Sequence, residues 1–276
     1  MKKTLFAVII AAIVAAAMPG VTGAQDAVDP DRQTVRLTDP NRPGTVQVRL
    51  FQGSMTVRAY DGKDVIITAR GSTRRSYAFG RNPRTEGLRR LSSGGLSLNE
   101  ENNVVSIRDD SFDNLSLDIQ VPVKTNLKLD ATITGNLLVE RVDGDIEVTS
   151  LNGGVTLTNV AGSVVAHSTN GGLLVTMQRI TPQKPMAFTS VNGNVDVALP
   201  PDTMANLRLR TTRGDLYTDF DVQLKPSTTA TAVGSRRSFG RFGLDLERSI
   251  LGTINGGGPD FEFRTVNGDV YIRKGK

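Results

Sequence analysis

Ser150-Leu151-Asn152-Gly153-Gly154-Val155 is the first copy of a six-residue pattern that decides how this chain folds. The pattern is Ser/Thr-x-Asn-Gly-x-Val/Leu, and it returns at Ser168–Leu173, Ser190–Val195 and Thr265–Val270. A repeat this short predicts a stack of β-strand units, because each unit is too small to bury its own apolar face. The glycine in each copy suits a turn that other residues make only with strain.

Glycine also recurs every nine residues through the middle of the chain, from Gly135 to Gly171. After each of these glycines the second and fourth residues are apolar or small, as Ile146 and Val148 are after Gly144. Alternation of this kind predicts half-buried strands. The residues that we expect to form structural turns are Gly135, Gly144, Asn152, Gly153, Gly162, Asn170, Gly171, Asn192, Gly193, Gly214, Asn267 and Gly268.

The spacing favours an all-β fold of the single-stranded β-helix or β-solenoid type. Asn152 and Asn170 are 18 residues apart and Asn170 and Asn192 are 22 apart, which suits one full coil of a narrow solenoid. We expect these asparagines to form a ladder in which each amide bonds to its neighbour's backbone. Asp143-Gly144 and Asn152-Gly153 are also strong two-residue hairpin turns, so an antiparallel β meander or sandwich is the alternative.

The first 24 residues have the features of a signal peptide. Lys2 and Lys3 precede 13 apolar residues, fewer than the roughly 20 of a transmembrane helix, and small residues at Thr22-Gly23-Ala24 permit cleavage. Residues 25–44 are expected to form an exposed leader, and residues 45–276 a β-solenoid domain with loop insertions near 71–95 and 225–258. We therefore expect an exported protein in the periplasm, at the cell surface or secreted, with no stable membrane span after cleavage.

The composition limits the chemistry of the chain. It has no cysteine, so packing and strand hydrogen bonds must stabilise an exported protein that can form no disulfide. The formal net charge is +5, and removal of Lys2 and Lys3 with the signal leaves +3 because no acid is lost with them. This basic character points weakly to anionic partners such as polysaccharides or lipid headgroups. We expect no nucleic-acid partner.

A family resemblance covers Leu115 to Arg273 and, more loosely, Thr45 to Ile107. The segments that carry it, together with the Gly-Asp-Ile and Asn-Gly-Gly repeats, are Leu115–Pro122, Leu127–Leu129, Leu199–Asp202, Leu207–Thr211, Gly214–Leu216 and Phe261–Ile272. In this combination the chain resembles the bacterial "putative adhesin" family, which comprises exported or envelope-associated β-repeat domains of unknown function. The resemblance implies a β-helix-like fold and a non-catalytic envelope role, and it brings no catalytic residues.

Catalytic and metal chemistry have little support in the residues themselves. Alternation places the single histidine, His167, on an outer strand face, and zinc needs three or four ligands. Asp109, Asp110 and Asp113 lie in an expected turn, although paired acids serve glycoside hydrolysis. Asp145, Asn194, Asp215 and Asp269 follow repeated glycines, and we expect them to stabilise turns rather than to bind Ca²⁺. We expect no catalytic residue, cofactor or metal site.

Two segments rich in arginine are the candidates for contact with a partner, because arginine and aromatic residues are enriched at binding surfaces. Solvated loops are the alternative interpretation. The candidate contact residues are Arg74, Arg75, Arg81, Arg236, Arg237, Phe239, Arg241 and Phe242.

The functional hypothesis is an exported, non-enzymatic β-solenoid that acts as an adhesin-like interaction or scaffold module of the bacterial cell envelope. Its partners would be envelope proteins, anionic glycans or other copies of the chain bound through exposed coil ends. The alternatives are a polysaccharide hydrolase or lyase on a β-helix and an envelope-stress signalling partner. An enzyme of the first kind should gather two acids within about 5–10 Å in one groove.

Overall fold

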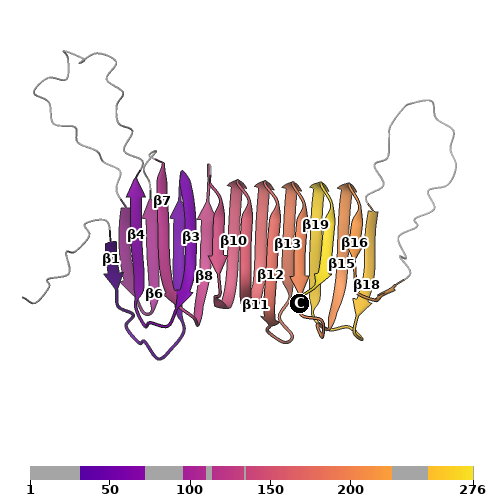
Figure 1. Cartoon of the computed structure of the whole chain (residues 1–276), viewed down its shortest axis with the longest axis horizontal. Helices are drawn as coiled ribbons and strands as arrows, with labels where there is room; N and C mark the ends of the chain where they lie inside the picture. The colour runs from indigo at the N-terminus through magenta and orange to yellow at the C-terminus, as the bar shows by residue number, and fades with distance from the viewer. Residues whose placement is uncertain (1–31, 72–95, 110–113, 134, 226–247, 276) are drawn as a thin grey trace, which may run out of the picture.

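The computed structural model describes residues 32–71, 96–109, 114–133, 135–225 and 248–275. The regular secondary structure of these residues consists of strands, which confirms the predicted all-β class. Twenty strands join into one mixed sheet, and Figure 1 shows them side by side along the long axis of the molecule. In this described part of the chain, no helix is long and apolar enough to cross a membrane. The signal sequence expected at residues 1–24 lies outside it.

The strand ladders form two rows, which meet in the long strand β11 (Val155–Asn170). Row A contains, in order, β1 (Arg32–Val35), β4 (Val65–Gly71), β7 (Leu115–Pro122), β3 (Gly53–Tyr60), β9 (Leu137–Glu140), the start of β11, β12 (Leu173–Ile180), β14 (Val195–Leu199), β20 (Val270–Lys274) and β16 (Leu216–Thr218).

Row B contains, in order, β5 (Leu96–Glu101), β6 (Val104–Asp109), β2 (Gly44–Leu50), β8 (Thr125–Ala131), β10 (Asp143–Asn152), the end of β11, β13 (Met186–Asn192), β19 (Asp260–Asn267), β15 (Ala205–Arg213), β18 (Arg248–Ile254) and β17 (Val222–Leu224). The chain passes from a row B strand to a row A strand at each Asn-Gly corner. One row B strand and the row A strand that follows it are called a layer below.

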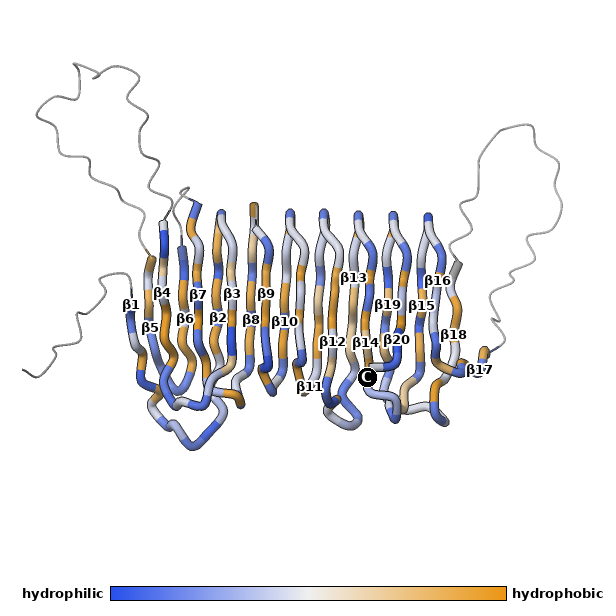
Figure 2. The backbone as a smooth tube through the Cα atoms, viewed as in Figure 1, coloured by the Kyte–Doolittle hydropathy of each residue, from blue (hydrophilic) through white to orange (hydrophobic). Residues whose placement is uncertain are grey.

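One apolar core lies between the two rows. Side chains alternate between buried and outward positions along the strands, and the hydropathy in Figure 2 alternates with them. The buried side chains of both rows belong to a single cluster, in which the rings of Phe188 and Phe263 stack at 5.1 Å. Val155 and Leu157, which the nine-residue pattern places inward, are fully buried. The predicted alternation therefore defines the core.

The central strands pair in parallel, with equivalent motif positions side by side. Asn152 pairs with Asn170, and Asn170 pairs with Asn192. Gly144 does not turn a hairpin, because it lies inside β10 and pairs with Gly162 of the next layer. The antiparallel alternative is therefore wrong for the centre of the chain, where all ladders formed by β8 to β14 are parallel.

Two layers do not follow the order of the sequence. The layer of β2 and β3 lies between β6/β7 and β8/β9, although the last two pairs follow each other directly in the chain. The layer of β19 and β20, close to the C-terminus, similarly lies between β13/β14 and β15/β16. Segments distant in sequence are thus held inside the stack rather than at its ends.

Antiparallel strands occur at the two ends of the stack, and two sequence expectations differ from the structure there. Arg32–Val35, inside the expected leader of residues 25–44, forms β1 and pairs with β4. Arg248–Ile254, inside the loop insertion expected near 225–258, forms β18 and pairs with β15. Apolar and polar residues alternate only weakly in both segments. They are strands because they pair with the edge of an existing strand, not because of a local sequence pattern. Residues 72–95 and 226–247 of the expected insertions lie outside the described residues.

Candidate interaction surfaces

A column of asparagine side chains follows the corner where each row B strand turns into row A. Asn170 donates its amide to the side-chain oxygen of Asn152 at 2.7 Å, and Asn192 donates in the same way to Asn170 at 2.8 Å. Asn267, 75 residues after Asn192, continues the column at 2.6 Å. At the start of the column, Asn152 donates its side-chain amide to the backbone oxygen of Ile133. The amides thus bond mainly to neighbouring side chains, not to neighbouring backbone as the sequence suggests.

A second column, of buried hydroxyls, lies beside the asparagines. Ser190 donates to the carbonyl oxygen of Gly171 and Thr265 to that of Gly193, each at 2.9 Å. Both hydroxyl residues are almost fully buried, where an unbonded polar group would be unfavourable. These hydroxyls are not among the residues predicted to be structural, although the sequence signal is present: the first position of every motif copy is Ser or Thr.

Glycine at the corners is required for two reasons. At Gly162 the backbone has φ +118°, and an added Cβ would also lie 2.0 Å from the carbonyl oxygen of Gly144. At Gly171 the φ is ordinary, but an added Cβ would lie 2.2 Å from the carbonyl oxygen of Gly153. Close packing of layers therefore excludes a side chain even where the turn itself does not. The predicted turn glycines with positive φ are Gly135, Gly162, Gly193, Gly214 and Gly268.

Cross-strand ion pairs occur on both outward faces. On row A, Arg58 of β3 lies between Asp118 of β7 and Glu140 of β9, at 3.1 and 2.7 Å. Further along the row, Arg273 of β20 pairs with Asp196 of β14 at 2.8 Å. Complementary charges on neighbouring strands stabilise the sheet modestly and keep these side chains ordered.

A groove of about 470 Å³ crosses row B over β2, β8, β10 and β11. Lys128 bonds to Glu147 at 3.1 Å, and Lys184 reaches both carboxylate oxygens of Asp145 at 2.7 Å. Ser163 also donates to Asp145, at 2.7 Å. The hydrogen bond from Lys184 and, next, that from Ser163 lower the pKa of the Asp145 carboxyl. The groove thus contains two ion pairs, Lys128 with Glu147 and Lys184 with Asp145, beside apolar side chains such as Val165.

The contacts in this groove limit the chemistry that Asp145 and Glu147 can perform. Asp145 and Glu147 point to the same side of β10, and two residues of strand separate their Cα atoms by about 7 Å. Glycoside hydrolysis uses two carboxyl groups that flank the scissile bond, and these two acids share one face of the groove. A general acid, however, needs a raised pKa, whereas the pKa of Asp145 is lowered. The geometry suits binding of polar groups better than proton donation by Asp145.

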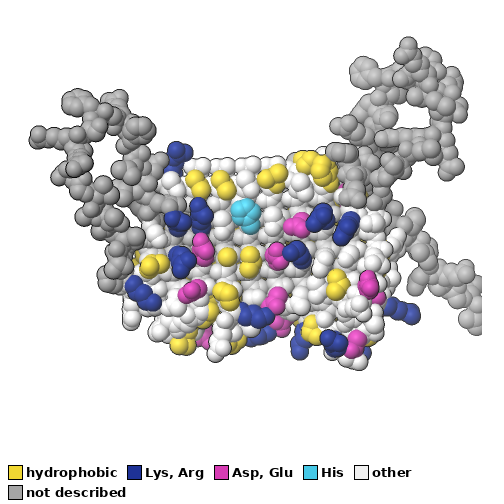
Figure 3. All heavy atoms as spheres, turned by 180° about the vertical axis from the view of Figure 1, so that it is seen from behind, with side chains coloured by type: hydrophobic (Ala, Val, Ile, Leu, Met, Phe, Trp, Pro, Cys, Tyr) yellow, Lys and Arg dark blue, Asp and Glu magenta, His cyan; other side chains and the backbone are white. Residues whose placement is uncertain are grey.

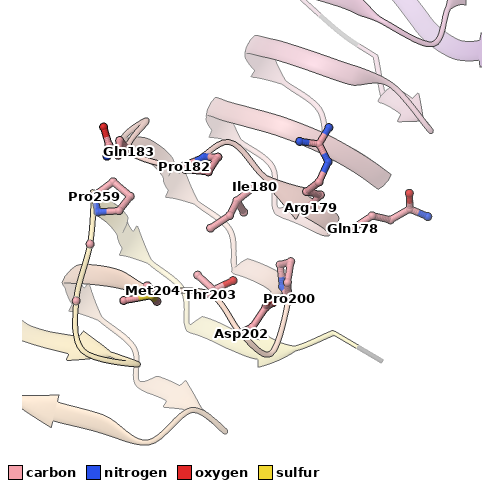
Figure 4. A pocket seen from close by; sticks show the side chains of 12 residues that line it. Gln178, Arg179, Ile180, Pro182, Gln183, Pro200, Asp202, Thr203, Met204 and Pro259 are labelled. Atoms are coloured by element: carbon pink, nitrogen blue, oxygen red, sulfur yellow. The ribbon is translucent and has the colours of Figure 1, made fainter.

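A cavity of about 490 Å³ lies where the chain leaves β12 and β14 of row A and turns towards row B, away from the asparagine column (Figure 4). In the figure, Ile180 and Pro182 from one segment face Thr203 and Met204 from another. Arg179 at its rim is held by Asp143 at 2.8 Å. The hydroxyl of Thr203 is buried without a hydrogen-bond partner among the residues described. Ile180, Met204 and the prolines make the lining mostly apolar despite these polar groups.

The remaining candidates for chemistry are separated from one another. His167 lies partly exposed on row B between Thr149 and Thr189, and it is the cyan side chain of Figure 3. Asn194 and Asp269 accept backbone N–H groups of the next layer at 2.9 Å, as expected of turn-stabilising side chains. No cluster of three or more metal-ligating side chains occurs among the residues that the structure describes.

Several predicted residues lie outside the described part of the chain. Asp109 is buried at the end of β6, but Asp110 and Asp113 lie outside the described residues. The same holds for all the candidate partner contacts of the arginine-rich segments: Arg74, Arg75, Arg81, Arg236, Arg237, Phe239, Arg241 and Phe242.

The family model described as Toastrack DUF4097 matches residues 90–238. A putative cell adhesion protein from Clostridium sporogenes is 10% identical with a TM-score of 0.44, over 88% of this chain and 99% of that one. A putative adhesin from Bacteroides fragilis is 11% identical with a TM-score of 0.32, over 88% and 95%. A putative adhesin from Parabacteroides merdae is 9% identical with a TM-score of 0.24, over 89% and 95%. The match to the family model confirms the family resemblance that the sequence shows. No curated protein matches the chain.

Proposed function

The chain belongs to the toastrack DUF4097 family, and we propose that it is a non-catalytic, exported β-solenoid that serves as an interaction or scaffold module of the bacterial cell envelope. The observation that carries this proposal is the asparagine column, which ties segments from Ile133 to Asn267 along one corner. The recurring asparagine side chains form hydrogen bonds between layers, and these bonds make the stack rigid. A rigid stack with two long faces suits a scaffold, as in other repeat architectures.

The outward faces support binding rather than catalysis. The acids of the row B groove are bonded to Lys128 and Lys184, and the lowered pKa of Asp145 keeps its carboxylate charged. Charged and hydrogen-bonded side chains on an open surface recognise polar partners. The partners that we propose are envelope proteins or anionic glycans.

The proposed location follows from residues 1–24, whose basic start, apolar stretch and small residues before Gln25 have the pattern of an export signal. A test is to express the whole chain in a bacterium and to sequence the N-terminus of the fractionated protein. A mature protein that begins at Gln25 outside the cytoplasm supports export. A chain that retains Met1 in the cytoplasm contradicts it.

The non-catalytic role is tested with residues 25–276 and a panel of acidic polysaccharides. Binding is measured by calorimetry, and cleavage by the appearance of new reducing ends or unsaturated products. We expect binding without turnover. If the protein cleaves a polysaccharide and the Asp145→Asn or Glu147→Gln variant does not, the non-catalytic role is wrong and the protein is a polysaccharide hydrolase or lyase.

A further inference from the structure

Two arginines lie side by side at one end of row B. Arg49 of β2 is in register with Arg108 of the parallel strand β6, and both side chains are exposed. Within the described part of the chain, neither guanidinium has an ion-pair partner, although Asp130 is in register with Arg49 on its other side. Neighbouring like charges on adjacent strands are destabilising. Two adjacent arginines without an acidic partner therefore need an explanation.

The pair differs from the ion pairs found elsewhere on the two faces, and it also differs from Arg210 and Arg264, a second arginine pair in register on row B, because each of those two has an interaction partner. Arg58 lies between two acids, Lys128 pairs with Glu147, and Arg273 pairs with Asp196. In those places oppositely charged side chains meet across neighbouring strands, in register at Lys128 and Glu147 and diagonally at Asp196 and Arg273. At Arg49 and Arg108 the register brings two positive charges together, so an external anion is the group that would complete the pattern.

The surroundings of the pair are polar and slightly hollow. A hollow of about 50 Å³ is lined by both arginines together with Gln47, Ser106, Lys128 and Asp130. Gln47 and Lys128 also line the groove of about 470 Å³ that continues across β8, β10 and β11. The hollow and the groove thus form a continuous track across neighbouring strands of row B, in which apolar side chains such as Val165 lie among the polar ones.

We propose that Arg49 and Arg108 form an anion subsite for an acidic polysaccharide, which lies across the strands of row B and extends into the groove. This assignment rests on the proposed binding function and names its ligand and its place. The planar guanidinium forks donate paired hydrogen bonds to a carboxylate or sulfate group. Amide and hydroxyl groups further along the track, at Asn126 and Ser163, suit the hydroxyls of the following sugars. The open shape admits an extended polymer.

The test is calorimetry on residues 25–276 with a polygalacturonate oligomer, which carries carboxylates, and separately with a heparin oligomer, which carries sulfates. Neutral dextran is the ligand control. The variants are Arg49→Gln and Arg108→Gln. The matched control is Arg208→Gln, an exposed arginine on the same face that is in register with Glu262 rather than with a second arginine.

We expect at least one acidic oligomer to bind, and each subsite variant to weaken that binding about tenfold, the loss of one charge-assisted contact. Arg208→Gln should leave affinity within about twofold, Asp130→Asn should strengthen it, and added salt should weaken it. The oligomer that binds identifies the preferred anion.

Equal losses at Arg208 and Arg49, or affinity for anionic phospholipid vesicles with none for either oligomer, would overturn the subsite. Failure of both oligomers to bind would do so as well. The scaffold role is judged separately, by turnover of the polysaccharide panel. All variants change exposed side chains, and unchanged thermal unfolding will verify that they fold.

Discussion

Ser150 and Ser168, in consecutive layers, donate their hydroxyls to the same acceptor, the carbonyl oxygen of Gly153, each at 3.1 Å. One bond stays within the corner of a layer and the other joins it to the next layer. The carbonyl group of Gly153 therefore holds its own turn together and also links that turn to the next layer. This shared acceptor explains why the motif begins with a hydroxyl residue.

Replacing Ser168 by alanine should lower the free energy of unfolding by about 1 kcal/mol, since one buried hydrogen bond is lost. Thr169→Ala is the matched control, because Thr169 is the next residue and lies partly exposed on the outer face. Urea unfolding followed by circular dichroism measures both. Equal stability of the two variants would show that the hydroxyl column contributes nothing.

Gly171→Ala should destabilise the protein by about 1–3 kcal/mol, as overpacking does. The added methyl would meet the carbonyl oxygen of Gly153 at 2.2 Å. Gly154→Ala, in the previous copy of the motif, is the control, because its nearest neighbouring atom would lie at an ordinary 3.8 Å. Thermal unfolding of the two variants distinguishes layer contact from a general effect of alanine. A Gly154 variant as unstable as the Gly171 variant contradicts the layer spacing.

Asp145 should make stability depend on pH in the acidic range. Its pKa in the folded protein is lowered, first by Lys184 and then by Ser163, so the unfolded chain binds more protons in that range. The stabilisation is present above the unfolded pKa of about 3.9 and is lost as pH falls through the folded value. Asp145→Asn should be less stable than wild type near neutral pH, and the difference should shrink towards about pH 2. Because Asp145 is half exposed, the effect will be small.

Urea unfolding at several pH values measures that difference. Asp196→Asn serves as the comparison, since Asp196 pairs with Arg273 away from the groove. A difference between Asp145→Asn and wild type that grows as pH falls has the wrong sign and would exclude the Lys184 bond as its cause.

A chain cut to residues 90–238, the segment that the family model matches, should not unfold cooperatively. It lacks β2 and β3, which lie between β6/β7 and β8/β9, and it lacks β19 and β20. Val46 and Phe263 of the missing layers are fully buried in the core. Circular dichroism during heating should show a broad transition for the short chain and a sharp one for residues 25–276. A sharp transition in both would mean that the inserted layers are dispensable.

The sequence predicts the core and the repeated corners well, because both depend on local pattern. Val155 and Leu157 are inward by alternation, and the spacing of Asn152, Asn170 and Asn192 matches the strand pairing. The position of β2 beside β6 and β8 is not predictable in this way. Alternation states which face of a strand is apolar, but it does not state which strand lies beside it.

The row B groove and the arginine pair could not be predicted from the sequence for the same reason. The groove depends on Lys184 reaching Asp145 from another layer, and the arginine pair depends on Arg49 and Arg108, 59 positions apart, sharing a register. Neither relationship leaves a local signal. At Gly171 the need for glycine arises from the neighbouring layer rather than from the turn, which local sequence does not indicate.

The layering of distant segments is tested most directly by cross-linking, because the chain has no cysteine of its own. Thr189 and Arg264 are side by side on β13 and β19, so cysteines at both positions lie within the reach of a disulfide. Cysteines at Thr189 and Glu262 would be about 8 Å apart between Cα atoms, beyond that reach. Under mild oxidation, we predict an intramolecular disulfide in the first double variant and not in the second. Equal cross-linking of the two, or none in the first, would contradict the parallel register on which the fold and the proposed function depend.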